Sequence, residues 1–152
     1  MGGNLTIKQL EAKANSIRKD IIRMLEEAGS GHSAGPLGLA DLVTTLYFDI
    51  MKVNPAKPDD PERDFFFLSN GHCVPVQYAT MAEAGYFPKE ELMTLRKWGS
   101  RLQGHPERKK LPGLENTSGP LGCGVSQGAG VAYTLQYIDR QPQRWVYVIT
   151  GD

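Results

Sequence analysis

The sequence predicts an α/β fold in which helices pack around a mainly parallel sheet. Two short apolar runs, residues 65–69 and 145–149, have the β-branched and aromatic composition of buried strands. Segments with helical periodicity precede the first run and separate it from the second. Strands that alternate with helices are typical of layered α/β domains. With 152 residues, the chain is expected to form one domain or part of one.

Two helices are predicted before the first strand. Apolar residues at three- and four-residue steps predict an amphipathic helix over residues 6–28. The segment GSGHSAGPLG, residues 29–38, breaks this helix, and a second apolar face predicts another over residues 39–50. The proline-rich stretch at residues 53–64 predicts an exposed, ordered loop.

The second half of the sequence is dominated by a long loop. After the first strand, NGHCVP turns into a helix ending near Ala84, and Pro88 suits the first turn of a helix over residues 88–97. Residues 99–124 are rich in glycine and proline, and irregular segments of this length are usually functional. Residues 124–138 predict a helix that leads to the closing strand.

Composition excludes several functional classes. The 17 basic and 17 acidic residues cancel, so nothing indicates binding to nucleic acid or to an anionic membrane. No apolar run approaches the ~20 residues that span a bilayer, and the polar start lacks signal-peptide features. Cys73 and Cys123 show no zinc or redox spacing, which predicts reduced thiols and a cytoplasmic location.

All three histidines, His32, His72 and His105, directly follow a glycine. Glycine lets the backbone approach a ligand closely, and imidazole exchanges protons near neutral pH, so the repeated dipeptide favours a ligand site. One alternative is that each histidine makes only a local hydrogen bond in its loop. A three-histidine zinc site is another, although no pair has the usual i, i+3 or i, i+4 spacing.

A glycine-rich segment, SGPLGCGVSQG at residues 118–128, leads into the last predicted helix. Free backbone N–H groups at a helix N-terminus suit a phosphate, so we expect residues 119–124 to contact a ligand. Gly128 and Gly130 are instead expected to allow close helix packing. The segment is not a Walker A loop, and its glycine spacing has one residue too many for a dinucleotide fingerprint.

Five segments together resemble a known family. GSGHSAGPLG, FLSNGH, GSRLQGHPE, SGPLGCG and the final GD are similar, in order and spacing, to the N-terminal, diphosphate-binding domain of transketolase. Residues 81–110 are most similar to split transketolases, whose N- and C-terminal halves are separate polypeptides. The resemblance implies the thiamine-diphosphate-binding fold, with residues 1–152 as an incomplete, N-terminal part of that domain. Deoxyxylulose-phosphate synthase shares the fold, but GHPE and GPLG favour transketolase.

The resemblance also implies a reaction and a site. A transketolase moves a two-carbon ketol unit from a ketose phosphate to an aldose phosphate in the pentose phosphate pathway, using thiamine diphosphate and a divalent metal, Mg²⁺ or Ca²⁺. By this resemblance, His32 and His105 are catalytic residues that face the substrate. Asp152 would be a metal ligand at the carboxyl end of the last strand, the edge where open α/β sheets bind ligands. The cofactor-binding residues would be His72, Gly119, Pro120, Leu121 and Gly151.

The family's metal-binding motif continues past the Gly-Asp pair at which this sequence stops, so we expect a fragment without ketol-transfer activity of its own. The implied partners are sugar phosphates and a C-terminal transketolase section or subunit, in a dimer or heterotetramer. Ser33 and Cys123 depart from the family pattern of proline and glutamine. A binding module of the same fold without catalysis, and an unrelated dinucleotide-binding domain, remain as alternatives.

Overall fold

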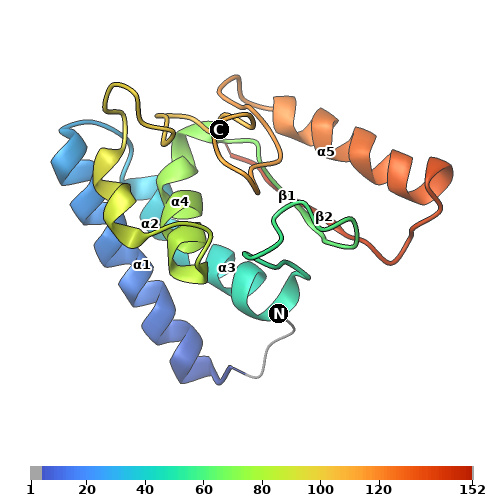
Figure 1. Cartoon of the computed structure of the whole chain (residues 1–152), viewed down its shortest axis with the longest axis horizontal. Helices are drawn as coiled ribbons and strands as arrows, with labels where there is room; N and C mark the ends of the chain where they lie inside the picture. Colours follow the sequence, from blue (N-terminus) through green and yellow to red (C-terminus); the bar gives the residue numbers. More distant parts are fainter. Residues whose placement is uncertain (1–4, 152) are drawn as a thin grey trace.

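The computed structural model describes residues 5–151, which form a small parallel sheet between two helical layers (Figure 1). Between the main elements run π-helical turns at Leu46–Ile50 and Thr134–Ile138 and 3-10 turns at Gly71–Cys73 and Lys89–Thr94. The helices and strands are α1 (Ile7–Ala28), α2 (Ala34–Gly38), α3 (Ala40–Thr45), β1 (Phe65–Leu68), α4 (Val74–Ala84), α5 (Cys123–Tyr133) and β2 (Val146–Ile149).

Helix α1 has the ends that its sequence predicts. The Thr6 backbone N–H donates to Gln9 Oε1 at 2.8 Å, and Gln9 N donates back to Thr6 Oγ1 at 3.3 Å, which forms a capping box. Gly29 ends the helix in the left-handed conformation, with φ of 61°. The predicted helix over residues 6–28 is therefore confirmed.

The two strands pair in parallel, with Phe65 opposite Val146 and Leu68 opposite Ile149. Alternate side chains point to opposite faces of a sheet. Phe66 and Leu68 accordingly join the main hydrophobic core, whereas Phe67 faces α5. The predicted α/β class with a parallel sheet is confirmed.

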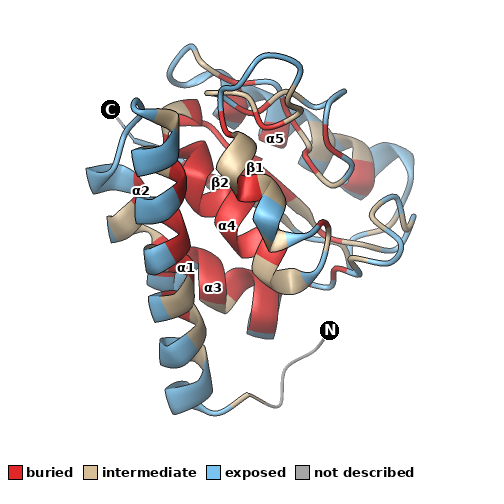
Figure 2. Cartoon of the chain, turned by 60° about the vertical axis from the view of Figure 1, so that its left-hand side comes forward, coloured by how far each residue is buried: buried red, intermediate tan, exposed pale blue. Residues whose placement is uncertain are grey.

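The core lies on the side of the sheet that carries α1, α3 and α4. Helix α4 is buried continuously from Val74 to Ala82, so it packs on all sides and appears as the red centre of Figure 2. The outward face of α1 is exposed. Among the described residues, no helix is both long and apolar enough to cross a membrane.

Two predicted helices differ from the structure. Helical structure begins at Ala34 instead of residue 39, because Pro36 lies in the first turn of α2, where a missing N–H costs no hydrogen bond. After Pro88 the chain forms only the 3-10 turns of Lys89–Thr94, not an α-helix to residue 97.

The second strand is less buried than predicted. Only Ile149 of β2 is buried, and Trp145, just before the strand, is 64% exposed. β1 is the neighbour of β2 in the described two-stranded sheet, and the opposite edge of β2 pairs with no strand of residues 5–151. The apolar run predicted a strand correctly but could not predict how much of it is covered.

Candidate functional site

The carboxyl ends of β1 and β2 bring two distant segments together. Ser69 N donates to Ile149 O at 2.8 Å, which extends the strand pairing by one residue. Asn70 then lies against Gly151, where a Cβ atom would come within 2.9 Å of Asn70 Nδ2. Ligands of open α/β sheets bind at this edge, so the edge is the first place to seek a site.

The three histidines meet at this edge although they come from three separate segments. His32 lies between α1 and α2, His72 in the 3-10 turn after β1, and His105 in the long loop. The His32 and His72 rings are 4.9 Å apart between centroids. Burial, together with the charges of Arg96, His32 and His72, lowers the pKa of the His105 imidazole. His105 therefore lies within electrostatic range of both other histidines and favours its neutral form, which can accept a proton.

The predicted cofactor loop lies next to His105. A Cβ atom placed on Gly119 would be 3.9 Å from His105 Cδ2. Pro120 and Leu121 are exposed, the latter by 53%, so an apolar side chain is presented to solvent beside a histidine. The structure thus brings Gly119 of this loop to His105, with Pro120 and Leu121 following it in the chain.

Helix α5 begins directly after this loop without a side-chain cap. Gly122 takes the N-cap position with φ of 86°, a conformation that glycine adopts without strain. Gly124, predicted to contact a ligand, instead packs on the protein, because its Cβ would lie 2.6 Å from Ser69 Cα. The lack of a side chain at Gly124 therefore serves the contact between α5 and the end of β1, and contact of its backbone with a ligand stays a prediction.

Protein packing accounts for the glycine before each histidine. A Cβ atom would lie 2.4 Å from Leu25 Cδ2 at Gly31, 2.3 Å from Ser118 Oγ at Gly71, and 2.9 Å from Arg96 Nε at Gly104. Contacts within the protein, and at Gly31 also a φ of 131°, therefore account for these glycines, and close approach of a ligand to them stays a prediction. They allow three loops to pack tightly enough for their histidines to converge.

Two buried polar atoms at the same edge have no hydrogen-bond partner within residues 5–151. These are Ser69 Oγ and Asn70 Oδ1, in residues that are 0% and 6% exposed. An unsatisfied buried polar atom is costly, and of the atoms without a partner in the described residues these two lie at the sheet edge where a ligand is expected. A hydroxyl can donate or accept and an amide oxygen accepts, which fits a cofactor that carries both charged and hydrogen-bonding groups.

The metal prediction rests on Asp152, which lies outside the described residues. Within residues 5–151, no three or more His, Cys, Asp and Glu side chains are grouped so that they could hold a metal ion. The zinc alternative therefore has no donor set in this part of the chain. Gly151, the predicted cofactor-binding neighbour of Asp152, is exposed beside Asn70.

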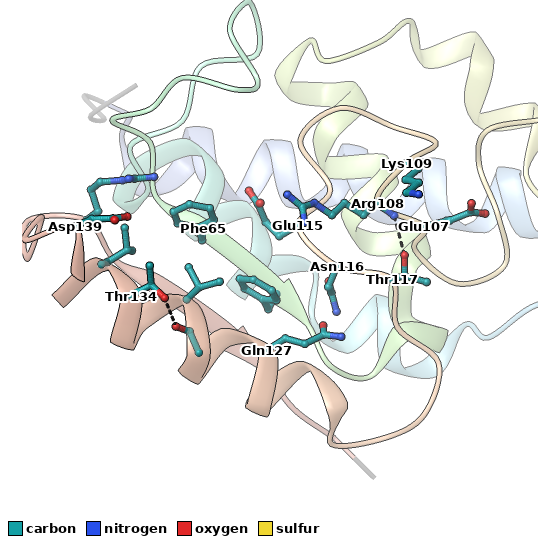
Figure 3. A pocket seen from close by; sticks show the side chains of 15 residues that line it. Phe65, Glu107, Arg108, Lys109, Glu115, Asn116, Thr117, Gln127, Thr134 and Asp139 are labelled. Atoms are coloured by element: carbon teal, nitrogen blue, oxygen red, sulfur yellow. Dashed lines mark hydrogen bonds between the residues drawn. The ribbon is translucent and has the colours of Figure 1, made fainter. Parts of the chain in front are cut away.

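A larger cavity, of about 760 Å³, lies away from the histidines under α5. Figure 3 shows Gln127 of α5 and Thr134 of the π-helical turn that follows it on one side, and Glu115 and Asn116 of the long loop on the other. None of the predicted site residues lines this cavity. A smaller hollow of about 400 Å³ adjoins His105, and the chemistry of its residues makes it the stronger candidate despite its size.

Sequence reasoning missed two residues, one that orders the sheet and one that lies in the site. Asp64 is buried just before β1, and its carboxylate accepts from Lys52 N and Trp145 N, each at 2.8 Å, which fixes the starts of both strands. Arg96 lies between the loops of His32 and His105. An acidic residue before a buried strand was a signal for the first, whereas nothing local indicated the second.

Comparison with known proteins identifies the family to which the sequence is similar. Residues 9–152 match the family model described as "Transketolase, thiamine diphosphate binding domain". A subunit of the apulose-4-phosphate transketolase of Phocaeicola vulgatus is 38% identical over 148 residues, which cover 97% of this chain and 52% of that protein. The 6-deoxy-6-sulfo-D-fructose transketolase subunit of a Clostridium species is 40% identical over 94% of this chain and 51% of its own.

A solved transketolase structure has the same fold over most of this chain. Transketolase from Leishmania mexicana superposes with a TM-score of 0.89 at 37% identity, covering 94% of this chain and 23% of that one. The chain thus spans about half the length of the two subunit relatives and about a quarter of the solved enzyme.

Proposed function

Because the chain belongs to the transketolase family through its thiamine diphosphate binding domain, we propose that it forms the cofactor-binding half of a two-part transketolase. Residues 1–152 would be the N-terminal part of that domain. The observation that carries the proposal is the convergence of His32, His72 and His105 beside the Gly119 loop. Conversion of a ketose phosphate and an aldose phosphate, as in the pentose phosphate pathway, is the activity that we assign to the complete enzyme.

The unpartnered atoms at the strand ends support cofactor binding at this edge. His72 would contact the diphosphate side of thiamine diphosphate, close to Ser69 and Asn70. When bound, the cofactor supplies a nucleophilic carbon and an electron sink for transfer of the two-carbon unit. The loop of Gly119, Pro120 and Leu121 would lie against it, with the exposed Leu121 side chain offering an apolar surface.

We assign proton handling to His32 and His105. The His105 imidazole favours its neutral form, so it can accept a hydrogen bond or a proton from a sugar hydroxyl at neutral pH. His32 lies against His72 and is exposed, which supports a role facing the substrate rather than the core. Because the His32 and His105 imidazoles lie at different positions, one can take a proton from the sugar while the other holds a proton elsewhere on the substrate.

We also propose that a divalent metal ion holds the diphosphate of the cofactor. A diphosphate is commonly held through a hard cation bound by oxygen atoms, and Mg²⁺ or Ca²⁺ would take the Asp152 carboxylate next to Gly151. Asn70 Oδ1 is a buried oxygen at the same edge that lacks a partner within residues 5–151. Within residues 5–151, no three or more His, Cys, Asp and Glu side chains form a metal-binding group, so we expect the remaining oxygen ligands from other parts of the complete enzyme.

We further propose that a C-terminal section or subunit completes the enzyme, in a dimer or heterotetramer. Two of the relatives are named as transketolase subunits, and this chain covers about half of each. The names of these relatives include a sugar phosphate and a sulfonated sugar. We propose a sugar phosphate as substrate and the cytoplasm as location, the latter supported by two cysteines that form no disulfide.

Cofactor binding is the first test. Thiamine diphosphate titrated with Mg²⁺ into the complete N-terminal section should change the near-ultraviolet circular dichroism, whereas NAD should not. The 152-residue chain alone should bind the cofactor only weakly, with little help from Mg²⁺. His72→Ala should weaken thiamine diphosphate roughly 10-fold or more, the effect of losing one hydrogen bond to a charged group. His105→Ala is the matched control and should leave this affinity near that of the parent. Binding of NAD instead would favour the dinucleotide-binding alternative.

Turnover is the second test and requires the complete N-terminal section together with the C-terminal partner. With a ketose phosphate and an aldose phosphate, His32→Ala and His105→Ala should lower kcat by ~10²–10⁴, the usual contribution of a positioned proton-transfer group. Cofactor affinity should stay unchanged in both variants. If all three histidine variants lower only the melting temperature, the histidines are structural and the proposal is wrong.

A further inference from the structure

Arg96 has an unusual backbone conformation beside the histidine cluster. Its φ is 61°, in the left-handed region that side chains other than glycine rarely adopt. Two buried leucines, Leu95 and Leu102, flank the turn that it begins, and Arg96 N donates to Leu102 O at 2.9 Å. A strained residue persists only where its surroundings hold it, which prompts the question of what its side chain does.

The guanidinium lies between the glycines that precede two of the histidines. A Cβ atom on Gly104 would be 2.9 Å from Arg96 Nε and 3.0 Å from Cζ, and a Cβ atom on Gly31 would be 3.9 Å from Nε. Nη1 also points toward Ser30 Oγ, at 3.5 Å. The planar group thus separates and spaces the backbones that carry His32 and His105, and alanine at position 104 would collide with it.

The positive charge of Arg96 has no carboxylate partner in the described part of the chain. Arg18, Arg63 and Arg101 each lie within 4.0 Å of an acidic side chain, and Arg96 takes part in none of the ion pairs there. It lines the hollow next to His105 together with Ser30, Gln103 and Gly104. The groups that act electrostatically on His105 are Arg96, His32 and His72, from three different segments.

We propose that Arg96 is a positioning residue that uses its guanidinium to hold the loops of His32 and His105 at a fixed spacing. Burial lowers the pKa of the His105 imidazole, and the nearby charge of Arg96 lowers it further. The effect on turnover rests on the proposed function, whereas the spacing of the two loops does not. Neither cofactor nor partner is therefore needed for the first measurement.

Imidazole NMR of the 152-residue chain provides that measurement. In Arg96→Gln, the His105 titration midpoint should rise and the His32 and His105 ring resonances should move. Arg96→Lys keeps the charge without the planar group, so it should preserve the midpoint better than Arg96→Gln while still moving the resonances. Arg140→Gln is the matched control, because Arg140 also has positive φ, 54°, but precedes β2 at the opposite end of the sheet.

The second measurement is turnover of the complete N-terminal section together with the C-terminal partner, and parent and variants are compared in that complete enzyme. Arg96→Gln should lower kcat about 10-fold or more at unchanged thiamine diphosphate affinity, since small displacements of reacting groups cost that much. Arg140→Gln should match the parent. If Arg96→Gln leaves the histidine resonances as they are in Arg140→Gln, the positioning role is refuted, even where the variant is less stable. If the parent itself shows no turnover, the proposed function fails while the NMR result still decides the role of Arg96.

Discussion

Helices α4 and α5 have the same length, 11 residues, and opposite surroundings. Helix α4 leaves the β1 end of the sheet and is buried from Val74 to Ala82. In α5 the only buried residues are Gly124 and Gly128. Figure 1 shows the same contrast, with α4 inside the helical body and α5 standing apart on the other face of the sheet.

The difference shows how the two helices contribute to the site. Helix α4 fixes the turn of His72 by anchoring it in the core, because that turn runs directly into Val74. Helix α5 touches the protein along one narrow line of glycines and presents its uncapped N-terminus beside the Gly119 loop. Helix α4 therefore contributes more to the stability of the fold, whereas the start of α5 lies where a ligand can reach the site.

The largest expected effect compares matched valines. Val76 of α4 is 0% exposed, so Val76→Asp would bury an unpaired carboxylate, and we expect a loss of ~4 kcal/mol or more, which would unfold most of the chain. Val125 in the first turn of α5 is 45% exposed, and Val125→Asp should be nearly neutral, because a negative charge is favourable near a helix N-terminus. Chemical denaturation followed by circular dichroism measures both.

Equal losses for the two aspartate variants would contradict the contrast between the helices. They would mean that the exposed face of α5 is covered in solution, for example by a second copy of the chain. Sedimentation of the Val125→Asp variant would then show a change in mass, which separates this outcome from simple unfolding.

The second comparison lies within α5. A Cβ atom on Gly128 would be 2.5 Å from Val148 Cγ2, so Gly128→Ala should cost about 1–3 kcal/mol by overpacking the contact with β2. Gly130 has no atom within 4 Å of that position, and Gly130→Ala should stabilise the helix by up to ~1 kcal/mol. Urea unfolding of both variants measures the sign of each change in the free energy of unfolding. The expectation that both glycines serve close packing is therefore wrong for Gly130.

Elements with a strong local signal were predictable from the sequence. The Thr6 cap and the apolar stripe marked α1, and the run of aromatic and β-branched residues marked both strands. Helix α2 was missed because glycine and proline favour loops unless the proline falls in a first turn, as Pro36 does. The exposure of Trp145 depends on what lies beside β2, which no local pattern records.

The site was predictable in its histidines but not in what holds them together. Three Gly-His pairs in one chain, with a family resemblance, indicated a common site, and the structure brings all three to one edge. Arg96, Ser118 and Leu25 supply the contacts that require the glycines, and these contacts join segments far apart in sequence. Side-chain packing across such distances leaves no periodicity to detect. The roles of the individual histidines stay predictions.

The smallest expected effect is a pH dependence near the start of α5. Burial and the charges of Arg96, His32 and His72 lower the pKa of His105 below 6.5, so the unfolded chain binds a proton at a higher pH than the folded one. The free energy of unfolding should therefore fall as pH drops below 6.5, and His105 should have no effect above that range. Because His105 is exposed, its share is expected to stay below about 1 kcal/mol. Groups that do not interact with His105 contribute equally to the parent and to His105→Gln, so the difference between the unfolding profiles from about pH 5 to pH 7 reports His105 and its coupling to His32 and His72. The difference should grow toward the acid end, with the variant retaining more stability, and parallel profiles would show that the proton on His105 is not coupled to the fold.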